Sequence, residues 1–162
     1  MAAVRSSVYT LFALAYLGCQ PAGEQPLTPA ETAAIAETVA DRFEEIATAT
    51  NNLEFDRLLG LYSKGDDLTY VARGRVTRSY AAFAELLHAQ FSGVTVARLS
   101  FLDKHVDVLS REVVVITAPY EFSATSSTGG IGGSSGTFTC VYVLRGGEWK
   151  IQHSSHTFGA TC

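Results

Sequence analysis

Cysteine, charge and long apolar runs are all scarce in this 162-residue chain. Its three cysteines are too few for a disulfide scaffold, and none has the C-x-x-C spacing of a structural zinc site. Only 17% of the residues are charged, the formal net charge is −4, and Lys and Arg do not cluster, which argues against nucleic-acid binding. After residue 19, no apolar stretch reaches the ~20 residues of a membrane-spanning helix. A hydrophobic content of 47% instead indicates one domain with a substantial core.

The N-terminus has the character of an export signal. Residues 1–18 combine the positive charge of Arg5 with a short apolar stretch and a small residue at the end, the pattern of a secretory signal peptide. The ending Leu-Gly-Cys at Cys19 resembles a bacterial lipoprotein signal, in which the cysteine is acylated and becomes the new N-terminus. We therefore expect residues 19–27 to be a lipid-anchored tether in the bacterial cell envelope. Plain secretory cleavage, with a periplasmic or secreted product, and an uncleaved N-terminal helix are the alternatives.

Helices dominate the first half of the remaining chain. Thr28 and Glu31, with Pro29 between them, form the signature of a capping box and predict a helix start. Apolar residues then recur at helical spacing, and a second short helix is expected after Asn52. A short strand is expected over 68–72, followed by a bend over 73–75. Ser79 is expected to cap a third helix, which ends before Gly93.

The second half is rich in β-branched and aromatic residues. Four runs predict strands over 94–109, 112–124, 136–145 and 148–158, and the glycine-rich segment 126–136 is expected to be a flexible hairpin loop. Helices followed by a long antiparallel sheet indicate an α+β fold.

A two-residue turn sets the expected pairing of the last two strands. Gly146-Gly147 favours a tight hairpin, because both glycines tolerate positive φ. The expected pairing sets Tyr142 opposite Ile151 and His153 opposite Cys140. Regular alternation then places these residues on the inner, apolar face and turns His156 outward. An inward His153 is either a satisfied core histidine or a polar group at the floor of a ligand cavity.

Several parts of the sequence resemble a SnoaL-like protein of the nuclear transport factor 2-like, ketosteroid isomerase-like superfamily. They are the helices, the Asp66-Tyr70 segment and above all the Gly-Gly-x-Trp-Lys-Ile hairpin. The resemblance makes residues 28–162 a SnoaL-like domain. It implies a cone-shaped α+β fold, in which a strongly curved antiparallel sheet wraps the N-terminal helices around a pocket. It also implies a homodimer formed through the outer sheet face. Members include isomerases, polyketide cyclases and dehydratases, so the fold alone does not select a chemistry.

The candidate site residues follow from the expected strand faces and from the resemblance. Asp67 occupies the stretch in which the superfamily's enzymes commonly place a general base, and His153 or Tyr62 would be the proton donor. Alternation and the resemblance together give the candidate ligand-binding residues, which are Tyr62, Tyr70, Tyr120, Cys140, Tyr142, Trp149 and His153. No metal and no cofactor is expected.

Three functional hypotheses remain open at this point. The first is an exported domain that binds a small apolar ligand, with catalysis optional. The second is a general acid/base enzyme, that is, an isomerase, cyclase or dehydratase. The third is a self-associating interaction module of the cell envelope, which would use the outer sheet face around Val141.

Overall fold

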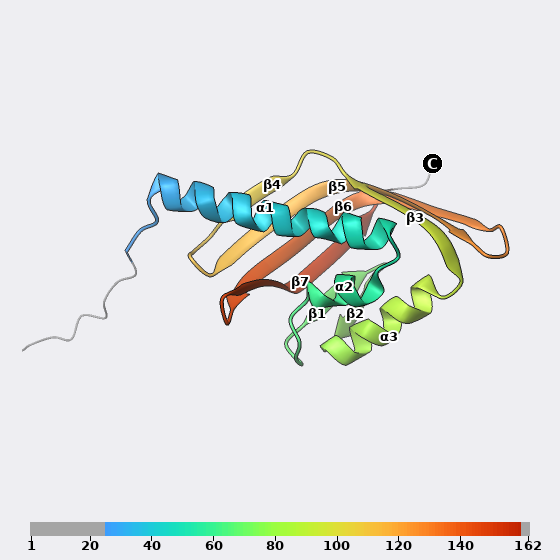
Figure 1. The fold of residues 1–162 in the computed structure, drawn as a ribbon. Helices are drawn as coiled ribbons and strands as arrows, with labels where there is room; N and C mark the ends of the chain where they lie inside the picture. The colour runs from blue at the N-terminus through green and yellow to red at the C-terminus, as the bar shows by residue number, and fades with distance from the viewer. Residues whose placement is uncertain (1–24, 160–162) are drawn as a thin grey trace, which may run out of the picture.

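The computed structural model describes residues 25–159 and has three helices and seven strands in that range (Figure 1). The expected signal peptide and Cys19 lie outside the described residues. The elements, in chain order, are α1 (Pro29–Asn51), α2 (Phe55–Gly60), β1 (Thr69–Ala72), β2 (Arg75–Arg78), α3 (Tyr80–Phe91), β3 (Val94–Phe101), β4 (His105–Val108), β5 (Val113–Ser126), β6 (Ile131–Arg145) and β7 (Glu148–Phe158).

The helix starts follow the sequence signals. At the start of α1, the hydroxyl of Thr28 accepts a hydrogen bond from the backbone N–H of Glu31 over 3.2 Å. The Glu31 carboxylate accepts one from the N–H of Thr28 over 2.8 Å. The hydroxyl of Ser79 caps α3 by accepting from the N–H of Ala82. Both predicted caps are therefore confirmed, because capping depends only on residues within one turn of each other.

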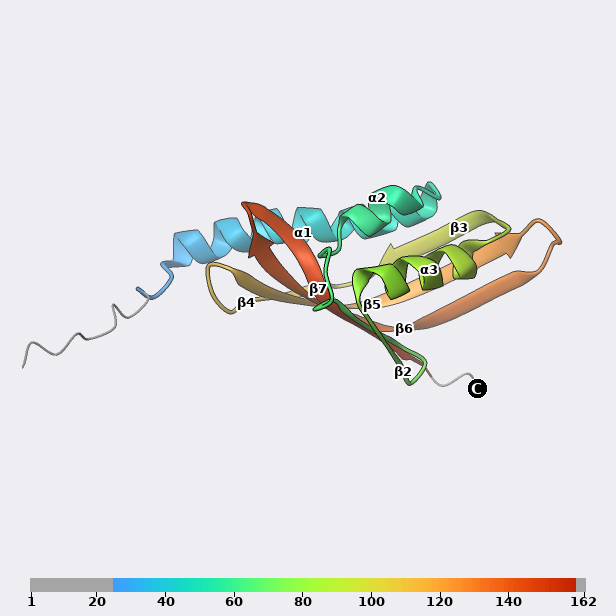
Figure 2. The same ribbon diagram turned by 90° about the horizontal axis from the view of Figure 1, so that it is seen from below.

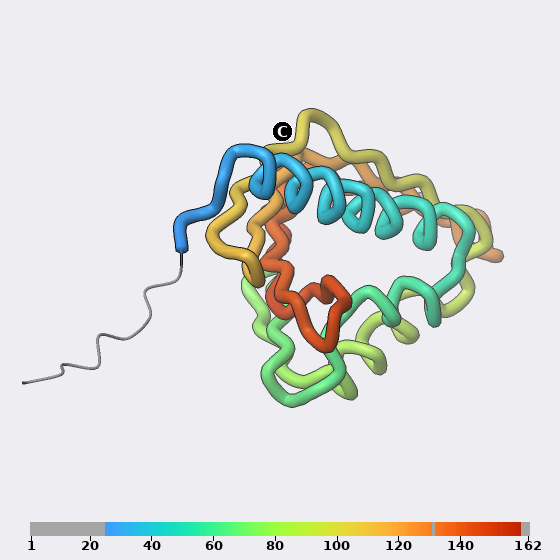
Figure 3. The backbone as a smooth tube through the Cα atoms, turned by 60° about the vertical axis from the view of Figure 1, so that its left-hand side comes forward, coloured from blue at the N-terminus to red at the C-terminus, as the bar shows by residue number. Residues whose placement is uncertain are grey.

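One curved sheet carries all seven strands, in the order β2-β1-β7-β6-β5-β3, with β4 also paired to β5. Every pair of neighbours is antiparallel except β1 and β7, which run parallel. Figure 2 shows the bend of the sheet, and Figure 3 shows α1 on one side of the molecule with α2 and α3 on the other. Phe43 of α1, Phe83 of α3 and Phe138 of β6 belong to a single buried core. The α+β prediction is confirmed.

The strand boundaries differ from the expectation in three places. The run 94–109 forms two strands, β3 and β4, and β2 forms a strand where only a bend was expected. The glycine-rich segment is largely ordered into β6, which pairs with β5 as far out as Ile131. Gly136 also approaches β7 closely, since a Cβ there would lie 1.9 Å from the carbonyl oxygen of Thr157. Glycine therefore allows close strand packing here and does not make the segment a flexible loop.

A β-bulge in β7 overturns the predicted strand faces. Tyr142 pairs with Ile151 as expected, but Val141 pairs with His153, so that Gln152 is an extra residue in β7. Beyond it, Ser154 faces Cys140. A one-residue insertion exchanges the two faces of a strand. The inward orientation predicted for His153 was therefore wrong.

Candidate functional site

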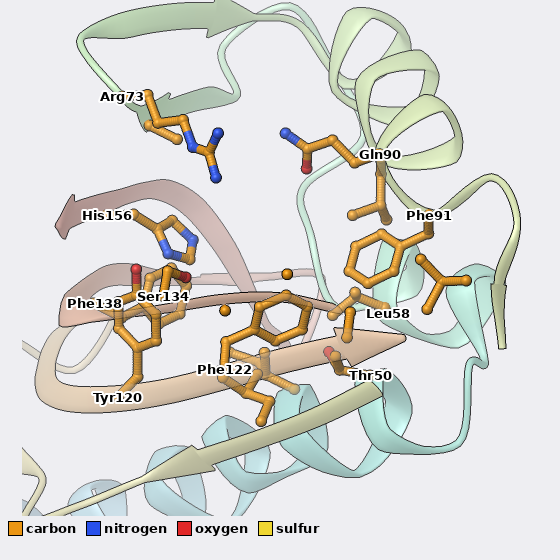
Figure 4. Close-up of a pocket in the computed structure, with 18 of the residues that line it drawn as sticks. Thr50, Leu58, Arg73, Gln90, Phe91, Tyr120, Phe122, Ser134, Phe138 and His156 are labelled. Atoms are coloured by element: carbon orange, nitrogen blue, oxygen red, sulfur yellow. The ribbon is translucent and has the colours of Figure 1, made fainter. Parts of the chain in front are cut away.

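The inner side of the sheet and the three helices enclose a chamber of about 520 Å³ (Figure 4). Most of its lining is apolar. The aromatic lining residues are Tyr62, Tyr70, Phe83, Phe91, Phe101, Tyr120, Phe122, Phe138 and Phe158. The aliphatic ones are Ile46, Leu58, Ala72, Leu87, Val94, Leu99 and Ala124. A concave and mostly apolar cavity of this volume is typical of small-molecule sites.

A few polar side chains enter this apolar surface. They come from Thr50 on α1, Gln90 on α3, Ser126 and Ser134 on β5 and β6, Arg73 after β1, and His156 on β7. No Asp or Glu is among the lining residues. The described lining therefore offers no carboxylate that could act as a general base.

His156 is the central titratable group of the chamber. Its imidazole lies among aromatic rings, with ring centroids 4.2 Å from Phe138, 5.4 Å from Tyr70 and 5.5 Å from Tyr120. Burial in these surroundings lowers its pKa to about 4. The ring is therefore neutral at neutral pH, with one nitrogen that donates and one that accepts.

Two tyrosine hydroxyls complete the polar part of this wall. Burial, followed by the proximity of Tyr120, raises the pKa of Tyr70 to about 12. The hydroxyl of Tyr120 is buried and has no hydrogen-bond partner among the described residues. Since a buried unpaired hydroxyl costs free energy, it is a group that a bound molecule can satisfy.

The structure brings three of the predicted ligand-binding residues together in the chamber, namely Tyr62, Tyr70 and Tyr120. Burial raises the pKa of Tyr62 well above its usual value, so its hydroxyl stays protonated.

The other predicted ligand-binding residues do not line the chamber. Cys140 and Tyr142 are fully buried in the core, and burial raises the pKa of the Cys140 thiol well above its ordinary value. Trp149 packs against the edge of the core near the β6–β7 turn. His153 lies across from Val141 and Thr69, on the outer side of the sheet.

Asp67 also lies away from the chamber. It is exposed, its carboxylate accepts a hydrogen bond of 3.0 Å from the side-chain amide of Gln152, and it lies 3.7 Å from the guanidinium of Arg145. The expected pairing of Asp67 with His153 in one pocket is therefore not found, because the loop before β1 and the outer face of β7 hold these side chains outside.

The sequence reasoning missed several of the polar lining residues. Gln90 had a usable signal, because it follows Phe83 and Leu87 at helical spacing on the chamber side of α3. His156 was assigned to the wrong face, and Arg73 had no signal beyond its place in a turn. Ser134 was hidden in a segment expected to be a loop.

Among residues 25–159, no group of three His, Cys, Asp or Glu side chains is arranged to hold a metal ion. Within the same range, no helix has both the length and the apolar character needed to cross a membrane.

Comparison with known proteins identifies the fold. A family model described as "SnoaL-like domain" matches residues 39–160. No curated protein sequence matches this one. The solved structures that it resembles share little sequence identity with it, so the likeness is one of fold.

Three of these structures illustrate the likeness. A proposed scytalone dehydratase from Novosphingobium aromaticivorans has a TM-score of 0.74 at 10% identity, over 82% of this chain and 89% of its own. A nuclear transport factor 2-like superfamily protein from Salmonella enterica has a TM-score of 0.72 at 12% identity, and the match covers 80% of this chain and 94% of that protein. A type 2 hexachlorocyclohexane dehydrochlorinase has a TM-score of 0.68 at 12% identity, and the match covers 82% of this chain and 90% of that protein.

Proposed function

This chain belongs to the SnoaL-like domain family, and from that premise we propose that it binds a small, mostly apolar molecule in the chamber. The observation that carries the proposal is the composition of the cavity. About 520 Å³ of space is surrounded by aromatic and aliphatic side chains, with His156 and the unpartnered hydroxyl of Tyr120 on one wall. Apolar surface supplies affinity in such a site, and a few polar groups orient the ligand.

Mass spectrometry of small molecules that copurify with the protein tests this proposal. A chamber-filling variant, Ala124→Phe, should lose the copurifying molecule because its ring occupies the cavity. Val115→Phe is the matched control, since Val115 lies on the same strand with the opposite orientation, across from Val141 of β6. If the wild-type extract contains no small molecule, and no apolar compound raises the melting temperature, the proposal is wrong.

A general acid/base enzyme is the second candidate, and His156 beside the Tyr120 hydroxyl is the observation that favours it. Two structural neighbours bear the names of a dehydratase and a dehydrochlorinase. However, a histidine with a pKa of about 4 is a weak base at neutral pH. No Asp or Glu of residues 25–159 lines the chamber to replace it. The chamber therefore supports ligand binding more strongly than acid/base catalysis.

We also propose that the protein is exported and anchored by lipid at Cys19. The support is the sequence pattern of residues 1–19 alone. Metabolic labelling with palmitate in a bacterial host should tag the wild type but not Cys19→Ala. Label that persists in this variant would refute the anchor.

A further inference from the structure

We propose that the ligand carries an anionic group, such as a carboxylate, at one end of its apolar body, and that Arg73 binds this group at the mouth of the chamber. The inference rests on the proposed binding function and adds the chemical class of the ligand. It follows from the distribution of charge around the cavity.

The part of the chamber wall formed by residues 25–159 has a single fixed charge. Arg73 is the only Lys or Arg among the lining residues, and none of them is Asp or Glu. His156 is neutral at neutral pH. Because the Arg73 guanidinium can form charge-assisted, bidentate hydrogen bonds with a carboxylate, an anionic end group gains most at this position.

Arg73 is held where it can meet a ligand. It lies in the tight turn between β1 and β2 with a φ of 50°, and its guanidinium lies 5.2 Å from the ring centroid of Phe158, which also lines the chamber. A cation over an aromatic face is favourable and restricts the side chain. Figure 4 shows Arg73 and Gln90 directed toward each other across the space above His156. A carboxylate there would accept hydrogen bonds from both side chains.

Among the described residues, no acid neutralises Arg73. Among residues 25–159, no ion pair and no side-chain hydrogen bond involves Arg73, Arg75 or Arg78. By contrast, Arg57, Arg111 and Arg145 each pair with an acid in the same range. The β1–β2 hairpin therefore presents unpaired positive charge in a protein whose net charge is −4.

Protection of the sheet edge explains only part of this charge. β2 is an edge strand, and charged residues such as Arg75 and Arg78 discourage edge-to-edge pairing. Arg73 lies in the turn outside both strands, so edge protection does not require it. Arg75 pairs with Ala72, which lines the chamber, and directly paired residues share a face of the sheet. A second cation therefore lies beside the mouth, where it would steer anions toward Arg73.

Isothermal titration with matched probes tests the inference. The probes are 2-naphthoate and 6-phenylhexanoate, together with the primary alcohols of the same carbon skeletons. Wild-type protein should bind each carboxylate at least ~10-fold more tightly than its alcohol, the factor that corresponds to about 1.4 kcal/mol. The preference should weaken as NaCl is raised, because Arg73 is exposed and salt screens it.

Arg73→Gln should bring each carboxylate within ~2-fold of its alcohol and leave the affinity for the alcohol unchanged. Arg78→Gln is the matched control, because Arg78 lies on the same hairpin across from Thr69 and does not line the chamber. It should keep the preference. Equal affinities in the wild type, or a preference that survives in Arg73→Gln, would overturn the anionic ligand but leave apolar binding intact. Failure of all four probes to bind would contradict the proposed function itself.

Discussion

His156 and Phe138 face each other across β7 and β6, with their ring centroids 4.2 Å apart. The pair exists because Gln152 is an extra residue in β7, which turns Ser154 and His156 toward the inner face. The bulge therefore places the imidazole in the chamber, where burial keeps it uncharged at neutral pH.

The first prediction concerns pH and stability. The pKa of His156 is about 4 in the folded protein, against 6.5 for a free histidine. The unfolded chain therefore binds a proton that the folded protein excludes across this range. The free energy of unfolding should rise between pH 4 and 6.5, with a contribution on the order of 3 kcal/mol from this group, and this contribution should be constant at higher pH. Urea denaturation at pH 4.5 and pH 7.5 measures the difference.

His156→Gln should flatten this rise, because glutamine does not titrate. His153→Gln is the control, since His153 lies on the outer side of the sheet and should leave the rise in place. Glu31 adds a separate dependence at lower pH, because its capping bonds lower its pKa to about 2. The contribution of Glu31 to the free energy of unfolding is lost as the pH falls from about 4.5 through 2. It is the same in the wild type, in His156→Gln and in His153→Gln. Equal pH profiles for wild type and His156→Gln would refute the assignment.

The second prediction concerns the hydroxyl of Tyr120. It is buried and has no hydrogen-bond partner among residues 25–159, so Tyr120→Phe should leave the free energy of unfolding of the ligand-free protein unchanged or raise it by up to ~1 kcal/mol. The same variant should bind a hydrogen-bonding ligand more weakly. Thermal melts with and without an identified ligand separate the two effects. A loss of ~2 kcal/mol or more in the ligand-free variant would show that the hydroxyl already has a partner.

The third prediction concerns the close approach of β6 to β7. A Cβ on Gly136 would overlap the carbonyl oxygen of Thr157, so Gly136→Ala should force the strands apart and cost about 1–3 kcal/mol. Gly132→Ala is the matched control on the same strand, because its Cβ would meet no atom within 4 Å. Chemical denaturation of both variants measures the difference in stability. Equal stabilities would contradict the close approach of β6 to β7 at Gly136.

The fourth prediction separates binding from catalysis. If a substrate is found, His156→Gln should lower its turnover by at least ~10²-fold, the low end for a positioned acid or base. Asp67→Asn should leave turnover unchanged, because that carboxylate is exposed and paired with Arg145. Turnover that depends on Asp67 and not on His156 would restore the assignment made from the sequence and overturn the one made from the chamber.

The fifth prediction concerns the proposed homodimer. Val141 and its neighbour across the ladder, Val115, lie on the outer sheet face and are only partly covered within one chain. If two copies associate through this face, Val141→Glu should convert the dimer seen by light scattering into monomers, because it would bury an unpaired charge. Glu85→Gln, at an exposed position of α3 and away from this face, should leave the dimer intact. A wild-type monomer would refute the proposal.

Much of the fold was accessible from the sequence because its signals are local. The Thr28 cap and the Ser79 cap depend on residues one turn away, and both were predicted correctly. The Gly146-Gly147 turn sets the pairing of its own neighbours, so Tyr142 and Ile151 were also paired correctly. The aromatic residues Tyr62, Tyr70 and Tyr120 were placed at the site because the resemblance implied a pocket and they lie in its buried elements.

The sequence by itself determined where the helices begin, which segments are apolar and how the last hairpin turns. The tertiary structure alone decided which histidine enters the chamber and which acid stays out. The reason is the bulge at Gln152. The side-chain amide of Gln152 donates a hydrogen bond to Asp67, and its side-chain oxygen accepts one from Arg145, so Gln152 joins β7 to a loop that is far away in sequence. The alternation of residues along β7 cannot reveal this extra residue, because the pairing of β7 with its neighbouring strands decides where a bulge lies.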